Sequence, residues 1–316
     1  MVHATGPLIP ATGHATRPLH PGRPPASRAL LTGAAGAAVR WRLYGLREAT
    51  RAHAPGELHG QVLAHAPVDR GAIQGADPHS ALRIRGQVAG NGCAAFAAAD
   101  LDLRIEGGVQ DGAAKCAAGG RLAVLKGKGS GGARLDGSAG KGFAYGAQRG
   151  TFFVQGVADS RFCIRLSGAR AVAGARLTAS IDDAGGPQAA RAHLKGFAFE
   201  YMTAGVAVVL GDPGPWCCAG MTGGVVYVKR WPEFGLDEAA LRRRLALGAQ
   251  VRIRAAGPRD AAALGDLLAA YRAELEASGQ PAEAAEVARI LAAGPACFMA
   301  VEPALSPVAT EVMSTE

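Results

Sequence analysis

The sequence predicts an all-β fold, a solenoid of the parallel β-helix type with a short α-helical C-terminal cap and a disordered N-terminal tail. Three observations lead to this prediction. Short apolar runs, each bounded by glycine, occur between residues 82 and 229. Several of their starting points recur at intervals of about 20 residues, which is typical of a solenoid repeat. The chain also has 45 glycines, which lie inside the apolar segments rather than in one linker.

Residues 1–52 are predicted to be a disordered, basic, Pro/Arg-rich tail, because they lack any apolar period. Glu48 is the first acidic residue, so the arginines before it contribute much of the net charge of +8. A nucleic-acid arm is the alternative, but no aromatic ladder accompanies the arginines, and we expect no nucleic-acid partner. No apolar run reaches the ~20 residues of a membrane span, so we expect no membrane contact and a cytoplasmic location.

Residues 53–235 are predicted to form the solenoid domain. A single repeat cannot bury its own inner face, but stacked repeats can, since equivalent strands pair at about 4.8 Å. Leucine-rich repeats share this period, yet their regular leucine pattern is absent. Glycine suits the corners because it adopts positive φ without steric cost. The predicted strands are 82–88, 101–107, 121–127, 151–156, 161–168, 206–211 and 225–229, with a weaker one at 143–147.

Residues 236–316 are predicted to be a helical extension. In 260–278, leucines and Tyr271 recur at helical spacing, with Asp260 as the N-cap and Gly279 after the end. A second helix is predicted over 281–293, where proline suits the first turn. We expect these helices to cover the open end of the solenoid, which otherwise exposes unpaired strand edges.

No catalytic, cofactor-binding or metal-ligating residue is predicted. The segment 127–132 matches GxGxxG after a strand, but the glycine-rich stretch that follows has no helical period, which argues against dinucleotide binding. None of the six cysteines forms a CxxC pair, so buried free thiols are expected. No nucleophilic triad or nucleophile elbow is indicated.

Two long segments resemble one known family. RFCIRLSGARAV (161–172) and FEYMTAGVAVVLGDPGPWCCAGMTGGVVYV (199–228) resemble the GXGXG domain at the C-terminus of the glutamate synthase large subunit. VDRGA (68–72) and GKGFAYGAQRGTFFVQGVADSRF (140–162) are similar to upstream segments of that family, and 278–291 and 297–303 to its closing motifs. The resemblance covers about residues 65–303 in the correct order, although several corner Asn and Gly positions are altered and about twenty residues are inserted near 176–196.

The resemblance implies a single-stranded right-handed β-helix without catalytic residues. It also implies a non-catalytic assembly subunit of a glutamate-synthase-like oxidoreductase complex, in glutamate biosynthesis or a related amine transfer. The expected partners are a glutaminase-type amidotransferase subunit and an FMN-binding synthase subunit. FMN and iron–sulfur clusters are then expected on those partners, with no cofactor in this chain. Whether the chain takes any part in catalysis stays open.

Two alternatives remain. The related C subunit of formylmethanofuran dehydrogenase, or of the formyltransferase/hydrolase complex, shares the β-helix, but the AGMTGG segment (219–224) and the helical tail resemble glutamate synthase more closely. The other alternative is an unrelated binding module that uses its basic N-terminal arm on an acidic partner, in which case binding should depend on salt. The amine donor and acceptor and the oligomeric state do not follow from the sequence.

Overall fold

The computed structural model describes residues 31–32, 38–39, 82–88, 90–99, 101–129, 132–174, 176–181, 183 and 192–304. The predicted tail, 1–52, lies almost entirely outside these ranges. The chain divides into two units, Met1–Tyr44 and Gly45–Glu316, each considered by itself. In the first unit, β1 (Leu31–Thr32) pairs antiparallel with β2 (Ala38–Val39).

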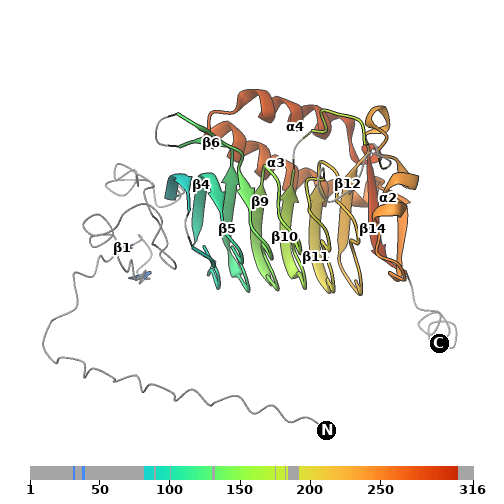
Figure 1. Cartoon of the computed structure of the whole chain (residues 1–316), viewed down its shortest axis with the longest axis horizontal. Helices are drawn as coiled ribbons and strands as arrows, with labels where there is room; N and C mark the ends of the chain where they lie inside the picture. The colour runs from blue at the N-terminus through green and yellow to red at the C-terminus, as the bar shows by residue number, and fades with distance from the viewer. Residues whose placement is uncertain are drawn as a thin grey trace, which may run out of the picture. The chain divides into compact units, whose positions relative to one another are not determined.

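A ten-stranded sheet organises the larger unit (Figure 1). Seven strands are parallel, and each pairs with the next of them along the chain. β14 (Phe298–Pro303) then pairs antiparallel with the last parallel strand, β13 (Val251–Ala255) lies outside it, and β8 (Ser138–Ala139) pairs with β4. The parallel strands are β3 (Leu82–Gln87), β4 (Asp102–Val109), β5 (Ala118–Leu125), β9 (Arg149–Val154), β10 (Ser167–Ala173), β11 (Ala204–Val209) and β12 (Val225–Lys229).

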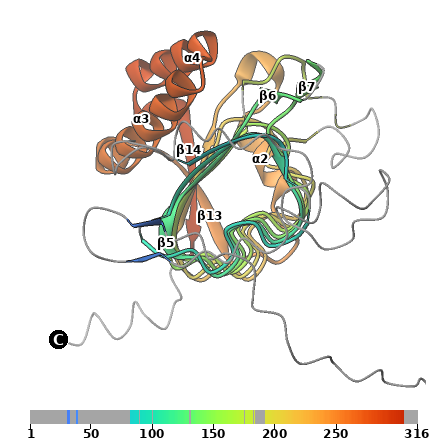
Figure 2. The same cartoon turned by 90° about the vertical axis from the view of Figure 1, so that its left-hand side faces the viewer.

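The prediction of an all-β, single-stranded right-handed parallel β-helix is wrong. The larger unit is mixed α/β, because helices form a layer of their own outside a mostly parallel sheet (Figure 2). Each repeat contributes one long strand, and most of the remaining backbone forms turns. The sequence had predicted the helices only as a short cap on the solenoid.

The helices were predicted correctly, but their position was not. α3 (Ala261–Ala277) and α4 (Pro281–Ala293) match the two predicted helices, and α2 (Glu238–Arg244) precedes them. α3 lies across the outer face of the sheet, where Tyr271 stacks on Phe153 of β9 with ring centroids 5.4 Å apart. The helices therefore cover a face of the sheet, and β14 with β13 completes the end where we had expected them. Among the described residues, no helix combines the length and apolarity that crossing a bilayer requires.

Six turn segments stack on the side opposite the helices, and we call them the turn wall: 92–97, 112–117, 142–147, 161–166, 197–202 and 216–221. In each segment the first, third and fifth residues have positive φ, as in Gly142, Ala144 and Gly146 at 65°, 53° and 61°. Backbone bonds join neighbouring segments, for example from the N–H of Cys163 to the carbonyl of Phe143 at 2.8 Å. Within each segment, N–H groups bond to carbonyls three residues earlier, as in consecutive β-turns.

The turn wall corrects two strand predictions. Residues 143–147 and most of 161–168 are turns, and the strand β10 begins only at Ser167. Their apolar alternation looks like a strand because it also alternates between inward and outward side chains. The backbone differs, since Arg161, Cys163 and Arg165 have φ of 64°, 53° and 54°. Positive φ costs a residue other than glycine about 1–2 kcal/mol, so the sequence did not suggest it.

The core lies between the sheet and the turn wall. Phe143 and Phe162, from adjacent wall segments, are fully buried and stack with ring centroids 5.5 Å apart. Phe199 meets Phe162 edge to face at 5.8 Å. The inward residues of the strands, such as Leu122 and Phe152, close the core from the sheet side. Because the helices cover its other face, the sheet is buried on both sides, which explains its nearly continuous apolar strands.

Candidate functional site

The glycine-rich segment 127–132 is part of a small hairpin. β6 (Gly127–Lys128) pairs antiparallel with β7 (Arg134–Leu135), and the N–H of Gly129 bonds to the carbonyl of Ala133 at 2.8 Å. A dinucleotide loop needs a helix at this point, whose N-terminus would receive the pyrophosphate. The hairpin takes its place, in agreement with the argument against nucleotide binding.

The cysteines do not converge on a cofactor site. Cys163, Cys217 and Cys218 are buried, and burial raises the pKa of the Cys163 thiol well above its usual value. Burial likewise raises the pKa of Cys93 to about 11. Cys93 and Cys163 lie in separate wall segments from the adjacent pair Cys217 and Cys218, and in 82–304, gaps aside, no three His, Cys, Asp or Glu side chains are grouped to hold a metal. The raised pKa values of the Cys93 and Cys163 thiols do not suit reactive nucleophiles, whereas Cys116 and Cys297 are only half-buried.

A fully buried arginine forms the strongest polar cluster. Arg244, at the end of α2, has no exposed surface. Its Nε and Nη2 donate to the two carboxylate oxygens of Asp212 at 2.6 and 2.9 Å. Its Nη2 and Nη1 also donate to Asp183, at 2.9 and 3.2 Å, and Nη1 to the carbonyl of Ala240 at 3.0 Å. Although burial lowers the pKa of Arg244, the two carboxylates raise it overall. The guanidinium is therefore a permanent charge that ties three segments together.

His193 lies beside this cluster. Its Nδ1 accepts a hydrogen bond from the backbone N–H of Asp212 at 3.3 Å. Burial lowers the pKa of His193, and the positive charges of Lys195 and Lys126 act in the same direction against Asp212. The imidazole is therefore held neutral with Nδ1 unprotonated, which suits a structural acceptor.

Two further carboxylate clusters join the helical layer to the sheet. Glu274 of α3, only 2% exposed, accepts from the Nε of Arg104 at 2.8 Å. At the N-terminal end of α3, Asp260 accepts from Tyr227 Oη at 2.8 Å and from both Nη atoms of Arg254. Hydrogen bonds from Arg254 are the main reason that the pKa of Asp260 lies well below its usual range. Both carboxylates are buried and bound by side chains of neighbouring elements, so neither is placed to exchange a proton with a substrate.

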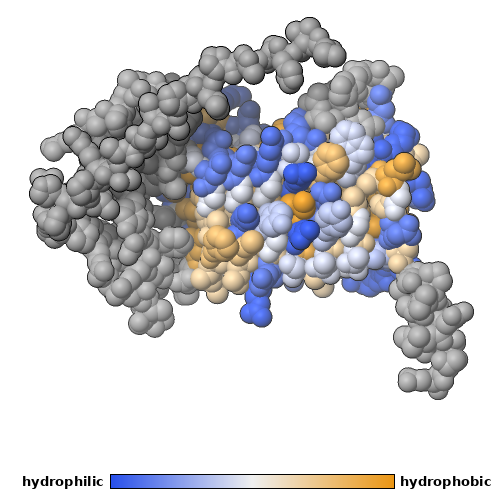
Figure 3. Space-filling view, turned by 60° about the horizontal axis from the view of Figure 1, so that its bottom comes forward, coloured by the Kyte–Doolittle hydropathy of each residue, from blue (hydrophilic) through white to orange (hydrophobic). Residues whose placement is uncertain are grey.

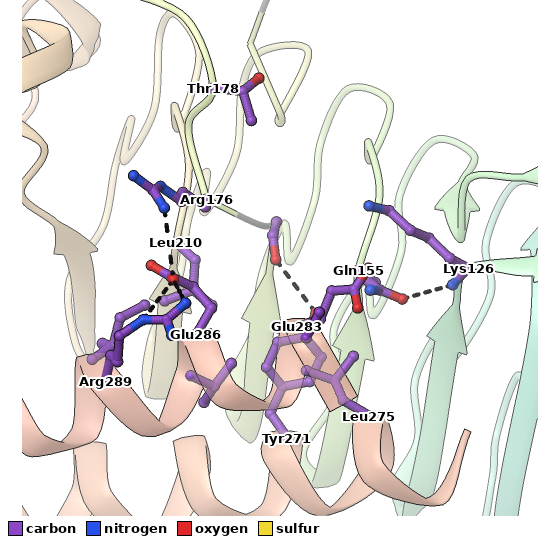
Figure 4. A pocket seen from close by; sticks show the side chains of 14 residues that line it. Lys126, Gln155, Arg176, Thr178, Leu210, Tyr271, Leu275, Glu283, Glu286 and Arg289 are labelled. Carbon is purple, nitrogen blue, oxygen red and sulfur yellow. Dashed lines mark hydrogen bonds and ion pairs between the residues drawn. The ribbon is translucent and has the colours of Figure 1, made fainter. Parts of the chain in front are cut away.

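A cavity of about 270 Å³ lies between the helices and the carboxyl ends of the parallel strands (Figure 4). Arg176 and Arg289 both point at Glu286, with Nη1 of Arg176 at 3.8 Å and Nε of Arg289 at 3.1 Å from Oε2. The side chain of Gln155, 1% exposed, accepts from the N–H of Lys126 at 2.7 Å. Glu286 is thus paired with both arginines, and Gln155 with the backbone of Lys126.

The outward side of the turn wall carries side chains that the sequence reasoning missed. Within the described residues, the exposed large apolar side chains are Phe96, Phe197, Tyr201, Trp216 and Leu247, and all but Leu247 belong to the wall. Figure 3 brings this lower face of Figure 1 forward, where apolar and charged side chains alternate. No local signal marks this outward set, because most of the positive-φ wall positions in the segments that hold it carry residues other than glycine.

Comparison with known proteins supports a single family. The profile of the GXGXG motif matches residues 69–234, more than half of the chain. Over 141 residues the chain is 33% identical to the chloroplastic ferredoxin-dependent glutamate synthase 2 of Arabidopsis thaliana and 34% identical to the glutamate synthase [NADPH] large chain of Bacillus subtilis. It is 36% identical, over the same length, to the glutamate synthase [NADH] of Schizosaccharomyces pombe. The match covers 44% of this chain but only 6–8% of each relative.

Proposed function

Since this chain belongs to the GXGXG motif family, we propose that it is a non-catalytic assembly subunit of a glutamate-synthase-like complex. It would act in glutamate biosynthesis or a related amine transfer, in the cytoplasm. A glutaminase-type amidotransferase subunit would supply ammonia, and an FMN-binding subunit with iron–sulfur clusters would carry out the reduction. The relatives reported above are glutamate synthases, which favours this proposal over the formylmethanofuran dehydrogenase alternative.

One observation carries the proposal: the charged side chains that the described structure buries are engaged in ion pairs with other elements. Arg244 of α2 pairs with Asp212, which follows β11, and Arg104 of β4 pairs with Glu274 of α3, so these pairs tie the helices to the sheet and its connections. A functional acid or base needs a perturbed pKa together with access to a substrate. The buried groups lack that access, so the described residues favour a rigid spacer over a catalyst.

The proposal is tested with the purified full-length chain and with the chain co-expressed with its two proposed partners. Alone, it should show no flavin absorbance near 450 nm and no glutaminase activity. Co-expressed, it should elute with both partners in one complex by size-exclusion chromatography with light scattering. A chain that is yellow and releases ammonia from glutamine on its own would refute the non-catalytic role. Partners that form an active complex without the chain would refute the assembly role.

A further inference from the structure

The outward face of the last two wall segments gathers large aromatic side chains. Trp216 is 51% exposed, Tyr201 50% and Phe197 39%. The rings of Phe197 and Trp216, from adjacent segments, stack with centroids 4.9 Å apart. Exposed aromatic side chains that lie next to each other, unlike scattered ones, are typical of binding surfaces.

The backbone makes these aromatic residues costly to keep. Phe197, Tyr201 and Trp216 have φ of 55°, 54° and 59°, a conformation that only glycine adopts freely. The earlier wall segments place Gly112 and Gly142 at the position equivalent to Trp216. Glycine would relieve the strain and remove exposed apolar surface as well. Phe96 has the same strained backbone, so what sets Phe197, Tyr201 and Trp216 apart is that such costly residues lie together on one surface.

The rings are held in place before any partner arrives. Tyr201 packs against Gly220 of the next segment, where an added Cβ would come to 2.5 Å from a ring carbon. On its other side, the guanidinium of Arg165 lies 5.6 Å from the centre of the Tyr201 ring. Such fixed aromatic and arginine side chains lose little freedom on binding, which favours affinity.

The charges around these rings are mainly positive. Arg161 and Arg165 extend from the wall segment beside Phe197 and Tyr201, and the side chain of Arg161 is 63% exposed. Glu200 is a carboxylate that lies among these residues. Its Oε2 is 3.9 Å from Nε of Arg161, and its side chain is only 17% exposed. A partner that meets this face therefore gains from carboxylates placed around an apolar centre.

We propose that Phe197, Tyr201, Trp216, Arg161 and Arg165, the aromatic wall patch, dock a protein subunit whose contact face is apolar with a carboxylate rim. The inference rests on the proposed function only for the expectation that this subunit belongs to the same complex. A second copy of this chain fits less well, because it would bring the same arginines against each other. Single-stranded nucleic acid could also stack on aromatic rings, and the test separates it.

The test compares two variants with matched backbone changes. Phe197→Gly with Trp216→Gly removes the stacked pair, whereas Phe96→Gly removes an exposed aromatic at φ 58° in the first wall segment. Each purified variant is titrated against the immobilised glutaminase-type and FMN-binding subunits. We expect the double variant to bind one of them at least tenfold more weakly and Phe96→Gly to bind within twofold of the wild type. Thermal melting should show no loss of stability in either variant.

Two further experiments test the role of charge and identify the bound partner. Arg165→Glu should weaken binding at least fivefold and reverse its salt dependence. In cells, a photo-cross-linking residue at position 216 should link to an acidic peptide of the bound subunit, whereas the same residue at position 96 should not. Binding by the double variant within twofold of the wild type overturns the docking surface, as does a cross-link to RNA or to a second copy of this chain. If the wild type binds neither subunit, the proposed function fails. The docking surface is then tested by the cross-link from position 216 alone, which should form in the wild type and be lost when Arg165→Glu is added.

Discussion

Replacing Arg244 by methionine is expected to lower the free energy of unfolding by about 3–5 kcal/mol, the usual effect of breaking a buried ion pair. The structure places this variant at the upper part of that range. Arg244 is fully buried and donates two hydrogen bonds to Asp212, two to Asp183 and one to Ala240. Its loss leaves Asp212, 5% exposed, as an uncompensated buried charge.

The assay is urea unfolding followed by circular dichroism, with the midpoint and the slope compared between variants. A loss of this size should lower the melting temperature by roughly 6–20 °C in a domain of this length. Arg242→Met is the matched control on the same helix, because the Arg242 side chain is 62% exposed and pairs only with the exposed Glu238. We expect that control to change the unfolding free energy by less than about 0.5 kcal/mol.

A double-variant cycle then tests the cause. Adding Asp212→Asn to Arg244→Met neutralises the orphaned carboxylate and should recover part of the lost stability. The reasoning is refuted if Arg244→Met costs less than about 1 kcal/mol, a value typical of exposed pairs. It is also refuted if the second substitution adds its full cost to the first, because the two charges would then be independent.

Three more predictions concern protonation, backbone space and a buried hydroxyl. Burial lowers the pKa of His193 below its usual 6.5, so below that pH the unfolded chain binds more protons than the folded chain. The urea midpoint of the wild type should therefore fall between pH 7.5 and 5.5, and the midpoint of His193→Gln should fall less. Equal falls in the two proteins would contradict this prediction. Gly223→Ala places a Cβ 1.9 Å from a backbone oxygen and should lower the free energy of unfolding by about 2–3 kcal/mol. Gly142→Ala has open space around the new Cβ but φ of 65°, and should lower it by about 1 kcal/mol. Similar shifts in melting temperature would be inconsistent with a steric cause. Tyr227→Phe removes the 2.8 Å hydrogen bond to Asp260 and should lower the free energy of unfolding, measured with urea, by about 1.5–3 kcal/mol. An unchanged free energy would mean that the Asp260 carboxylate does not need this bond.

Local patterns predicted several elements well. The runs beginning near 82, 101 and 121 are strands β3, β4 and β5, and their regular spacing reflects the in-register parallel pairing. The leucine and tyrosine stripe of 260–278 is the buried face of α3. These predictions succeeded because periodicity of two or 3.6 residues follows directly from which side chains the element buries.

The wall segments were mispredicted for a physical reason. In 161–166 the side chains alternate inward and outward as they do in a strand, so the residue pattern is the same for both backbones. The positive φ of Arg161, Cys163 and Arg165 is tolerated because neighbouring segments bond to them above and below, as from the N–H of Arg165 to the carbonyl of Glu200 at 2.7 Å. That support comes from residues distant in sequence, and no local propensity contains it.

The sequence by itself determined the strand period, the two long helices and the family, because each depends on short-range spacing or on ordered motifs. Only the tertiary structure decided that the helices lie across the sheet, which makes the fold mixed α/β, and that Arg244 meets Asp183 and Asp212 in the interior. It likewise brought Phe197, Tyr201 and Trp216 together on one outward face. The physical reason is that burial and charge pairing depend on contacts between segments that stacking brings together, and those contacts leave no periodic trace along the chain.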